Sequence, residues 1–265
     1  MAITACHKRV QVNLFGLKKL LPLLLLWPTA VCAFDEPKPQ GSHGSSLAVD
    51  AGLWIATYAM ETYWIQPEGI NNFPTSSIDK YAREKTHGPQ VDAEYTSREM
   101  AWRNYSDAGI TGMVAGAIAS PFATKGPQLE KLSLVSRSFA VNNFATTFLK
   151  NAVHRSRPKP SLNPTVEQDG DNAKSFPSGH SSNAMVAATS IVLMTPDKPA
   201  AFHAVVYGLG ASIGLARIMA DRHFLTDVLV GGALGYGITR SVFTNQKQDT
   251  NVIAGLTSIG FRFVF

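Results

Sequence analysis

Two apolar segments of similar length, joined by a turn with two prolines, constrain the fold of this chain more than any other feature. The segments cover residues 178–194 and 200–220, and the turn reads Thr195-Pro196-Asp197-Lys198-Pro199. As helices, the first arm extends roughly 21 Å from His180 to the turn, and the second extends roughly 25 Å from Ala200 to Arg217. Arms of matched length predict an antiparallel hairpin, in which the start of the first helix lies beside the end of the second.

Further helices are expected on both sides of this hairpin. They cover residues 47–65, 107–119, 129–155 and 224–240, whereas residues 66–105 are polar and predict a loop-rich excursion that we interpret as a lid. Gly231 and Gly235 lie four residues apart in the last helix and predict close helix packing. The sequence therefore predicts an all-α fold, a single-domain helical bundle of about six core helices.

The last residues of the chain follow a different pattern. Ile259, Phe261, Phe263 and Phe265 alternate with other residues at period two, which predicts a short C-terminal β-strand. The pattern resembles the last strand of outer-membrane barrel proteins, but too few residues follow Arg240 to form a barrel. We interpret it as a strand packed on the body or on a second subunit, and the oligomeric state stays open.

The N-terminus has the layout of a secretory signal peptide. Basic residues precede the apolar run from Leu20 to Trp27, and a small-residue cleavage site ends at Ala33. The predicted organisation is a signal peptide at 1–33, a flexible leader at 34–46, the main domain at 47–243 and a C-terminal extension at 244–265. An uncleaved membrane anchor is the alternative, which Pro22, Pro28 and the shortness of the run disfavour.

Charge and cysteine content limit the partners of the mature chain. The first 33 residues hold four of the 24 basic residues and no acidic residue, which leaves 20 basic against 19 acidic residues elsewhere. A nearly neutral body gives no electrostatic reason to expect a nucleic-acid partner. Cys6 and Cys32 both lie in the predicted signal, so we expect no disulfide in an exported protein that is periplasmic or associated with the outer membrane.

Hydropathy does not favour a protein made of membrane-spanning helices. Mean hydropathy is +0.00, and the segment 200–220, although long enough to span, carries His203 and Arg217. We therefore favour a soluble or peripheral bundle over an integral one.

Three short stretches carry the candidate chemistry. Lys150 and Arg157 are seven residues apart, or two helical turns, and can present two cations from one helix face. Ser178, Gly179 and His180 open a predicted helix, where unpaired backbone N–H groups and the helix dipole favour an oxyanion. Taken alone, the two cations could be a solvated basic face, and Ser178 could simply be a helix N-cap.

The third stretch places Arg217 before a histidine and a carboxylate. His223 and Asp227 are separated by one helical turn, so the carboxylate could fix the imidazole tautomer and make the other nitrogen a nucleophile. Arg217 would point from another face of a continuous helix, which predicts a break near Asp221 and Arg222. With the hairpin, all three stretches meet at one end as an oxyanion cradle with a nucleophile and an acid.

The order K-x6-RP, PSGH and R-x5-H-x3-D resembles the signature of the type 2 phosphatidic acid phosphatase superfamily, with one departure at Ala216, where that family usually has serine. The resemblance covers residues 150–227. It implies catalytic roles for His223 as nucleophile, His180 as acid and base, and Asp227 as the residue that orients His223. It implies phosphate binding by the following residues: Lys150, Arg157, Ser178, Gly179 and Arg217.

The expected activity is hydrolysis of phosphate monoesters or pyrophosphates through a phosphohistidine, with no cofactor and no metal, because fixed cations would stabilise the charge. The substrate could be a lipid phosphate or a small soluble ester. Two alternatives stay open: a vanadium-dependent haloperoxidase, which would hold vanadate on His223, and a non-catalytic protein that binds phosphate or lipid.

Overall fold

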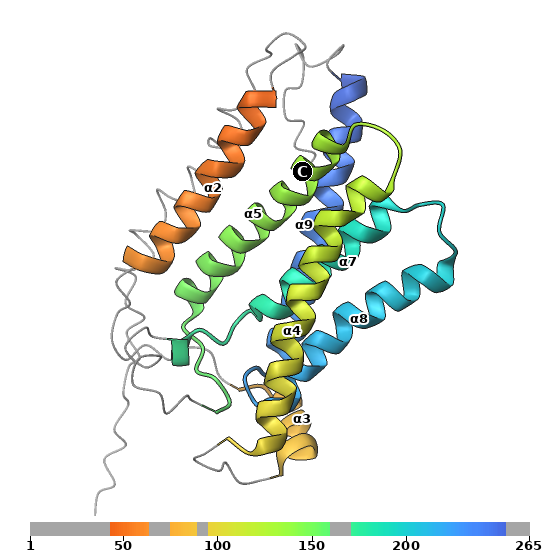
Figure 1. Ribbon diagram of the computed structural model, residues 1–265. Coiled ribbons are helices and arrows are strands. Elements are labelled where there is room, and N and C mark those ends of the chain that lie inside the picture. The colour runs from red at the N-terminus through yellow and green to blue at the C-terminus, as the bar shows by residue number, and fades with distance from the viewer. Residues whose placement is uncertain (1–42, 64–74, 89–94, 160–170, 253–265) are drawn as a thin grey trace, which may run out of the picture. The chain divides into compact units, whose positions relative to one another are not determined.

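The computed structural model describes residues 43–63, 75–88, 95–159 and 171–252, in which helices are joined by short connections (Figure 1). The all-α prediction is confirmed for this part of the chain. Its helices are α2 (His43–Tyr63), α3 (Ser77–His87), α4 (Ser97–Ala119), α5 (Gln128–Val153), α7 (Gly179–Met194), α8 (Ala200–Met219) and α9 (Leu225–Val252). Two 3-10 turns, at Ser120–Ala123 and Asp171–Ala173, complete the described elements.

The predicted hairpin is present as α7 and α8, joined by the turn after Met194. Helix α7 also contacts α4, α5 and α9, so it is the central helix of the bundle (Figure 1). Its buried face is built largely from small side chains, including Ala184, Ala187 and Ala188. Small side chains allow the neighbouring helices to approach α7 closely, and Val135 and Ile213 fill the space around them.

Gly231 and Gly235 lie where α9 packs against α7, and the predicted close packing is confirmed. A Cβ on Gly231 would stand 2.5 Å from the carbonyl oxygen of Ser178. A Cβ on Gly235 would overlap the carbonyl oxygen of Ser182 in the same way. Backbone therefore meets backbone along this contact, which fixes the start of α7 against α9.

The region 66–105 is more ordered than predicted, because it contains α3 and the first turns of α4. Ser76 caps α3 by accepting a hydrogen bond from the backbone N–H of Asp79 at 3.2 Å. Thr96 and Glu99 form a reciprocal capping box, which starts α4 ten residues before the predicted position. The prediction of a loop-rich excursion was wrong for these stretches because it overlooked the two capping patterns.

Other helix bounds differ at the ends of the bundle. Helix α2 begins at His43, inside the stretch predicted as a leader, and α9 continues to Val252, past the predicted end near Arg240. The predicted signal peptide at 1–33 and the predicted strand near residues 259–265 lie outside the described residues.

One described helix, α8, has the length and composition of a helix that could cross a membrane. Its outward positions carry the exposed apolar side chains Phe202, Val205, Leu209 and Leu215. Exposed apolar residues also occur on neighbouring helices, for example Ile118 on α4 and Leu229 on α9. The described helices thus expose more apolar side chains than we expect of the soluble or peripheral bundle that the sequence predicts.

Candidate active site

The three motifs meet at one end of the bundle, as the hairpin predicts. Each predicted residue lies at a helix end or in a connection: Lys150 in the last turn of α5, Arg157 after it, Ser178 at the start of α7, Arg217 in the last turn of α8, and Asp227 in the first turn of α9. The predicted helix break is confirmed, because α8 ends at Met219 and Asp221 has a left-handed backbone with φ of 51°. His223 lies in this break.

His223 is buried and held in one tautomer. Its Nδ1 lies 2.8 Å from the carbonyl oxygen of Ser175, which can only accept, so Nδ1 carries the proton. Nε2 lies 3.1 Å from Nη1 of Arg157, which can only donate. Burial, and then the charges of Arg157 and Arg217, hold the pKa of His223 well below its ordinary value. The ring is therefore neutral, with the lone pair on Nε2.

Asp227 supports His223 through a third residue rather than by direct contact. Its Oδ2 is 3.7 Å from Nδ1 of His223, which is too long for a hydrogen bond. The same oxygen accepts hydrogen bonds from Ser175 Oγ at 2.6 Å and from the Phe224 N–H at 2.9 Å. Asp227 thus fixes Ser175, whose carbonyl group fixes the imidazole. Burial raises the pKa of the Asp227 carboxyl, while the Ser175 hydrogen bond and the Arg155 charge oppose the rise.

His180 has a different environment at the open side of the site. Its Nε2 lies 2.9 Å from Oδ1 of Asp107, and the same oxygen accepts from Nη1 of Arg217 at 3.1 Å. Burial and the charges of Arg217 and Lys150 lower the pKa of His180 to about 4, although Asp107 acts to raise it. The neutral form of His180 is therefore favoured near neutral pH.

The expected phosphate ligands surround this pair of histidines. Ser178 is the N-cap of α7, and its Oγ accepts from the backbone N–H of Ser181 at 3.3 Å, so this residue caps the helix, while its part in phosphate binding stays a prediction. A Cβ on Gly179 would lie 3.5 Å from Nζ of Lys150. The start of α7 therefore lies close to that cation, and a helix N-terminus beside a cation favours an oxyanion.

Sequence reasoning missed three residues of the site: Asp107, Arg155 and Ser175. Asp107 comes from α4, more than 40 positions before the first motif, and was predicted only as a helix start. Arg155 lies inside the first motif and bonds Asp227, but it is one of the positions that the family pattern leaves free. Ser175 acts partly through its backbone, which no sequence pattern reveals. Full burial of Arg155, at 1% exposure, distinguishes it from a solvated cation.

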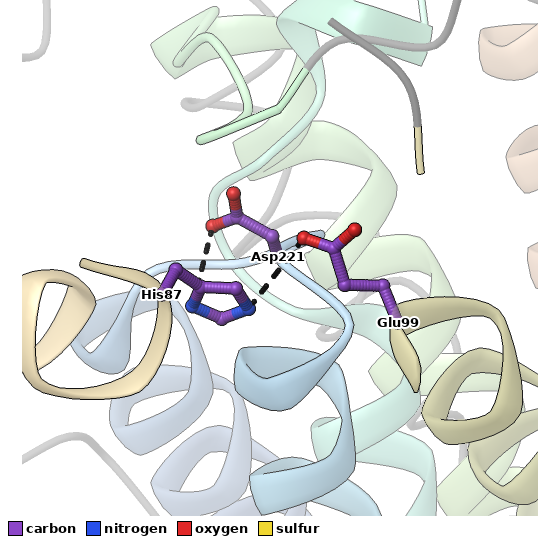
Figure 2. Close-up of side chains that lie close together, drawn as sticks. All are labelled: His87, Glu99 and Asp221. Atoms are coloured by element: carbon purple, nitrogen blue, oxygen red, sulfur yellow. Dashed lines mark ion pairs between the residues drawn. The ribbon is translucent and has the colours of Figure 1, made fainter. Parts of the chain in front are cut away.

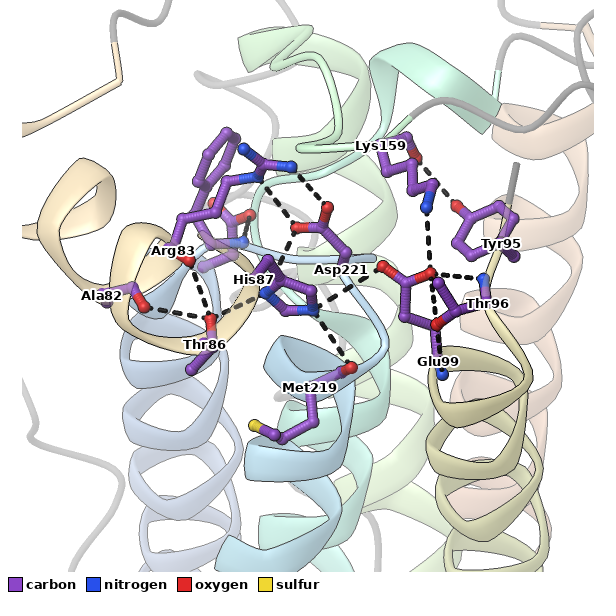
Figure 3. A network of polar contacts seen from close by, with 12 residues as sticks. Ala82, Arg83, Thr86, His87, Tyr95, Thr96, Glu99, Lys159, Met219 and Asp221 are labelled. Atoms are coloured by element: carbon purple, nitrogen blue, oxygen red, sulfur yellow. Dashed lines mark hydrogen bonds and ion pairs between the residues drawn. The ribbon is translucent and has the colours of Figure 1, made fainter. Parts of the chain in front are cut away.

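A second polar cluster lies beside the break between α8 and α9 (Figure 2). His87, Glu99 and Asp221 offer ligand atoms within 4.8 Å of one another, as in a metal site. However, Arg83 Nη2 lies 2.8 Å from Asp221, and Lys159 Nζ lies 2.9 Å from Glu99. Figure 3 shows these cations closing the cluster on both sides. Because each carboxylate is already neutralised, we interpret the cluster as an ion-pair network.

Comparison with known proteins agrees with the geometry. A sequence model of the PAP2 superfamily matches residues 132–250. A stretch of 85 residues is 34% identical to the lipid A 1-phosphatase of Porphyromonas gingivalis; it covers 29% of this chain and 19% of that relative. The chain thus spans about a fifth of the length of the curated relative that it matches.

Two solved structures are similar in fold. The crystal structure of Aquifex aeolicus LpxE has 19% sequence identity and a TM-score of 0.47, and the match covers 66% of this chain and 98% of that one. The transmembrane PAP2-type phosphatidylglycerolphosphate phosphatase from Bacillus subtilis has 20% identity and a TM-score of 0.48, with 77% and 96% covered. The motifs, their convergence and the matched family model agree with one another: residues 132–250 of this chain match the PAP2 superfamily.

Proposed function

We propose that the protein is a phosphatase that hydrolyses phosphate monoesters or pyrophosphates through a phosphohistidine at His223. The observation that carries this proposal is the neutral, buried imidazole of His223, whose Nδ1–H is held by Ser175 and whose Nε2 lone pair is directed at Arg157. A nucleophilic imidazole needs this tautomer and a cationic site for the phosphoryl group.

The first half-reaction forms the bond between Nε2 of His223 and phosphorus and breaks the bond between phosphorus and the leaving oxygen. Lys150, Arg157 and Arg217 would hold the phosphoryl oxygens, together with Ser178 and the Gly179 N–H. His180 gives its proton to the leaving oxygen. In the second half-reaction, His180 takes a proton from water, whose oxygen attacks phosphorus as the bond to Nε2 breaks.

The protonation state of His180 is expected to depend on substrate. Without a ligand, burial and nearby cations lower its pKa to about 4. A phosphate group beside Lys150 and Arg217 would offset those cations and raise the pKa, so that His180 is protonated when the leaving group is in place. We therefore expect a bell-shaped pH profile with its optimum on the acid side of neutrality.

We infer a lipid phosphate as the substrate class. The exposed apolar side chains on α8 and α9, including Leu209, Leu215 and Leu229, are suited to contact with acyl chains or a bilayer surface. The relative from Porphyromonas gingivalis is named as a phosphatase of a lipid, which supports the same class. A small soluble ester is the competing substrate.

We further propose that the chain is exported and works at a membrane surface in the periplasm or at the outer membrane. The signal-like N-terminus and the apolar outer positions of α8 support this placement. The mass of the mature protein tests cleavage after Ala33. Cell fractionation tests the surface: release by salt indicates a peripheral protein, whereas a need for detergent indicates an integral one.

The central experiment measures phosphate release by the purified protein in EDTA, beside His223→Ala. The substrates are p-nitrophenyl phosphate, phosphatidic acid and a polyprenyl pyrophosphate. Turnover that persists in EDTA and is lost in the variant supports the metal-free histidine mechanism, and the best substrate identifies the class. Absence of turnover on all three contradicts the proposal, and bromide oxidation after vanadate loading then tests the haloperoxidase alternative.

A further inference from the structure

Helix α3 lies outside the stretch that matches the family model. Its first turn nevertheless contacts the start of α9, between His223 and Asp227. Asp79 Oδ1 accepts a hydrogen bond from the backbone N–H of Thr226 at 2.9 Å, and Oδ2 accepts from the Thr226 hydroxyl at 2.8 Å. Thr226 stands between His223 and Asp227 in the first turn of α9. Asp79 therefore anchors the backbone that carries the catalytic pair.

A second connection from Asp79 passes through Arg155. Nη2 of Arg155 lies 2.7 Å from Asp79, and Nη1 lies 2.5 Å from Asp227. The side chain of Arg155 is 1% exposed, and the side chains of Asp79 and Asp227 are 0% exposed. One guanidinium group thus bridges two carboxylates in the interior, where loss of either partner is costly because charge is poorly solvated.

Asp79 is held as a carboxylate. Its burial opposes ionisation, but hydrogen bonds from Ser76, Arg155 and Thr226 together lower the pKa of Asp79 below its ordinary value. The series Asp79, Arg155, Asp227 therefore alternates in charge and ends at Ser175, which holds Nδ1 of His223. Each member restricts the position of the next.

We propose that Asp79 is a positioning residue for the phosphatase reaction, acting on His223 through Arg155 and Asp227. This inference rests on the proposed function. In Asp79→Asn, Arg155 would lose one of its two carboxylate partners and would be drawn towards Asp227, and Thr226 would keep only one of its two acceptor oxygens. The imidazole would then be displaced from its line of attack, which affects the chemical step more than substrate binding.

The test compares Asp79→Asn with the matched control Asp50→Asn. Asp50 is also a buried carboxylate, and it pairs with Arg137 at 3.1 Å between α2 and α5, away from the motif residues. We expect Asp79→Asn to lower kcat by about a hundredfold with KM little changed. The control should lower Tm yet retain the parent kcat. Equal kcat values for Asp79→Asn and the parent would overturn the inference.

A double-substitution cycle with Asp227→Asn separates positioning from general stability. If Asp79 acts through Asp227, the double variant should be little slower than Asp227→Asn alone, because residues that act as a unit are not additive. Multiplied losses would show independent action and contradict the inference. Circular dichroism establishes that each variant is folded.

Arg155→Lys serves as a second variant if Asp79→Asn does not fold. It keeps the charge but removes the planar group that reaches both carboxylates, and a similar fall in kcat is expected. A parent kcat in this variant would contradict the bridge. A parent protein with no turnover overturns the proposed function and this inference together, whereas His223-dependent turnover that is indifferent to Asp79 and Arg155 overturns the inference alone.

Discussion

The two histidines of the site stand in contrasting surroundings. His223 is 3% exposed and is held by a backbone carbonyl group that Asp227, itself 0% exposed, keeps in place. The side chain of His180 is 32% exposed, and its partner Asp107 is 46% exposed. The interior thus fixes the tautomer and direction of His223, the proposed nucleophile, while the protonation of His180, the proposed acid, can respond to solvent and to a substrate. A site that attacks and protonates in sequence benefits from this division.

The sharpest test of the buried side is His223→Ala. We expect loss of phosphate release by at least about a thousandfold, because the variant lacks the imidazole that would form the bond to phosphorus. Steady-state assays of p-nitrophenyl phosphate measure it. Trapping of labelled phosphate on the parent but not on the variant would identify the covalent intermediate, and comparable rates would refute the assignment.

Substitution of His180 tests the open side, and its effect should depend on the leaving group. His180→Asn is expected to reduce kcat by roughly a hundredfold or more for an alkyl phosphate, whose leaving oxygen needs a proton. The loss should be smaller for p-nitrophenyl phosphate, which leaves as a stable anion. An equal loss on both substrates would mean that His180 binds phosphate rather than donating a proton.

Asp107→Asn should act on the pH profile more than on the maximum rate. Asp107 raises the pKa of His180 against burial and the charges of Arg217 and Lys150. Removal of the carboxylate charge therefore lowers that pKa, and the alkaline limb of kcat should move to lower pH. The profile is measured from pH 4 to 9 on the parent and the variant. A shift to higher pH contradicts this electrostatic role.

Stability should fall as the solution becomes acidic. The pKa of His180 is lowered from 6.5 to about 4 in the folded protein, so the unfolded chain binds the proton first. The resulting stabilisation is complete above about pH 6.5 and is lost as the pH falls towards 4. Tm measured at pH 7 and pH 5 should differ less in His180→Gln than in the parent. The same difference in both proteins would exclude His180 as the source.

The packing of α9 on α7 supplies the smallest test, with a control on the same helix. Gly231→Ala would place a methyl group 2.5 Å from the Ser178 carbonyl oxygen, whereas a Cβ on Gly237 meets nothing within 4 Å. We expect Gly231→Ala to destabilise the protein by about 1–3 kcal/mol. Gly237→Ala should be neutral or slightly stabilising. Equal urea midpoints for the two variants would show that the contact relaxes freely.

Sequence and structure agree where the information is local. The helical hairpin, the break near Asp221 and the convergence of the three motifs all follow from period, spacing and turn residues. Asp107 and Asp79 could not be found in this way, because their partners lie 73 and 76 positions away and only the fold brings them together. The capping patterns at Ser76 and Thr96 were readable, and they would have predicted α3 and the early start of α4.

The contacts of α3 and α4 have a consequence for the boundaries of the catalytic unit. The family match begins at residue 132, but Asp79 and Asp107, which contact Arg155 and His180, precede it. A fragment cut at the matched boundaries, or a graft of the three motifs onto another scaffold, would contain every signature residue and still lack both carboxylates. A fragment that keeps both carboxylates beside the motif residues must therefore start no later than the cap of α3 at Ser76.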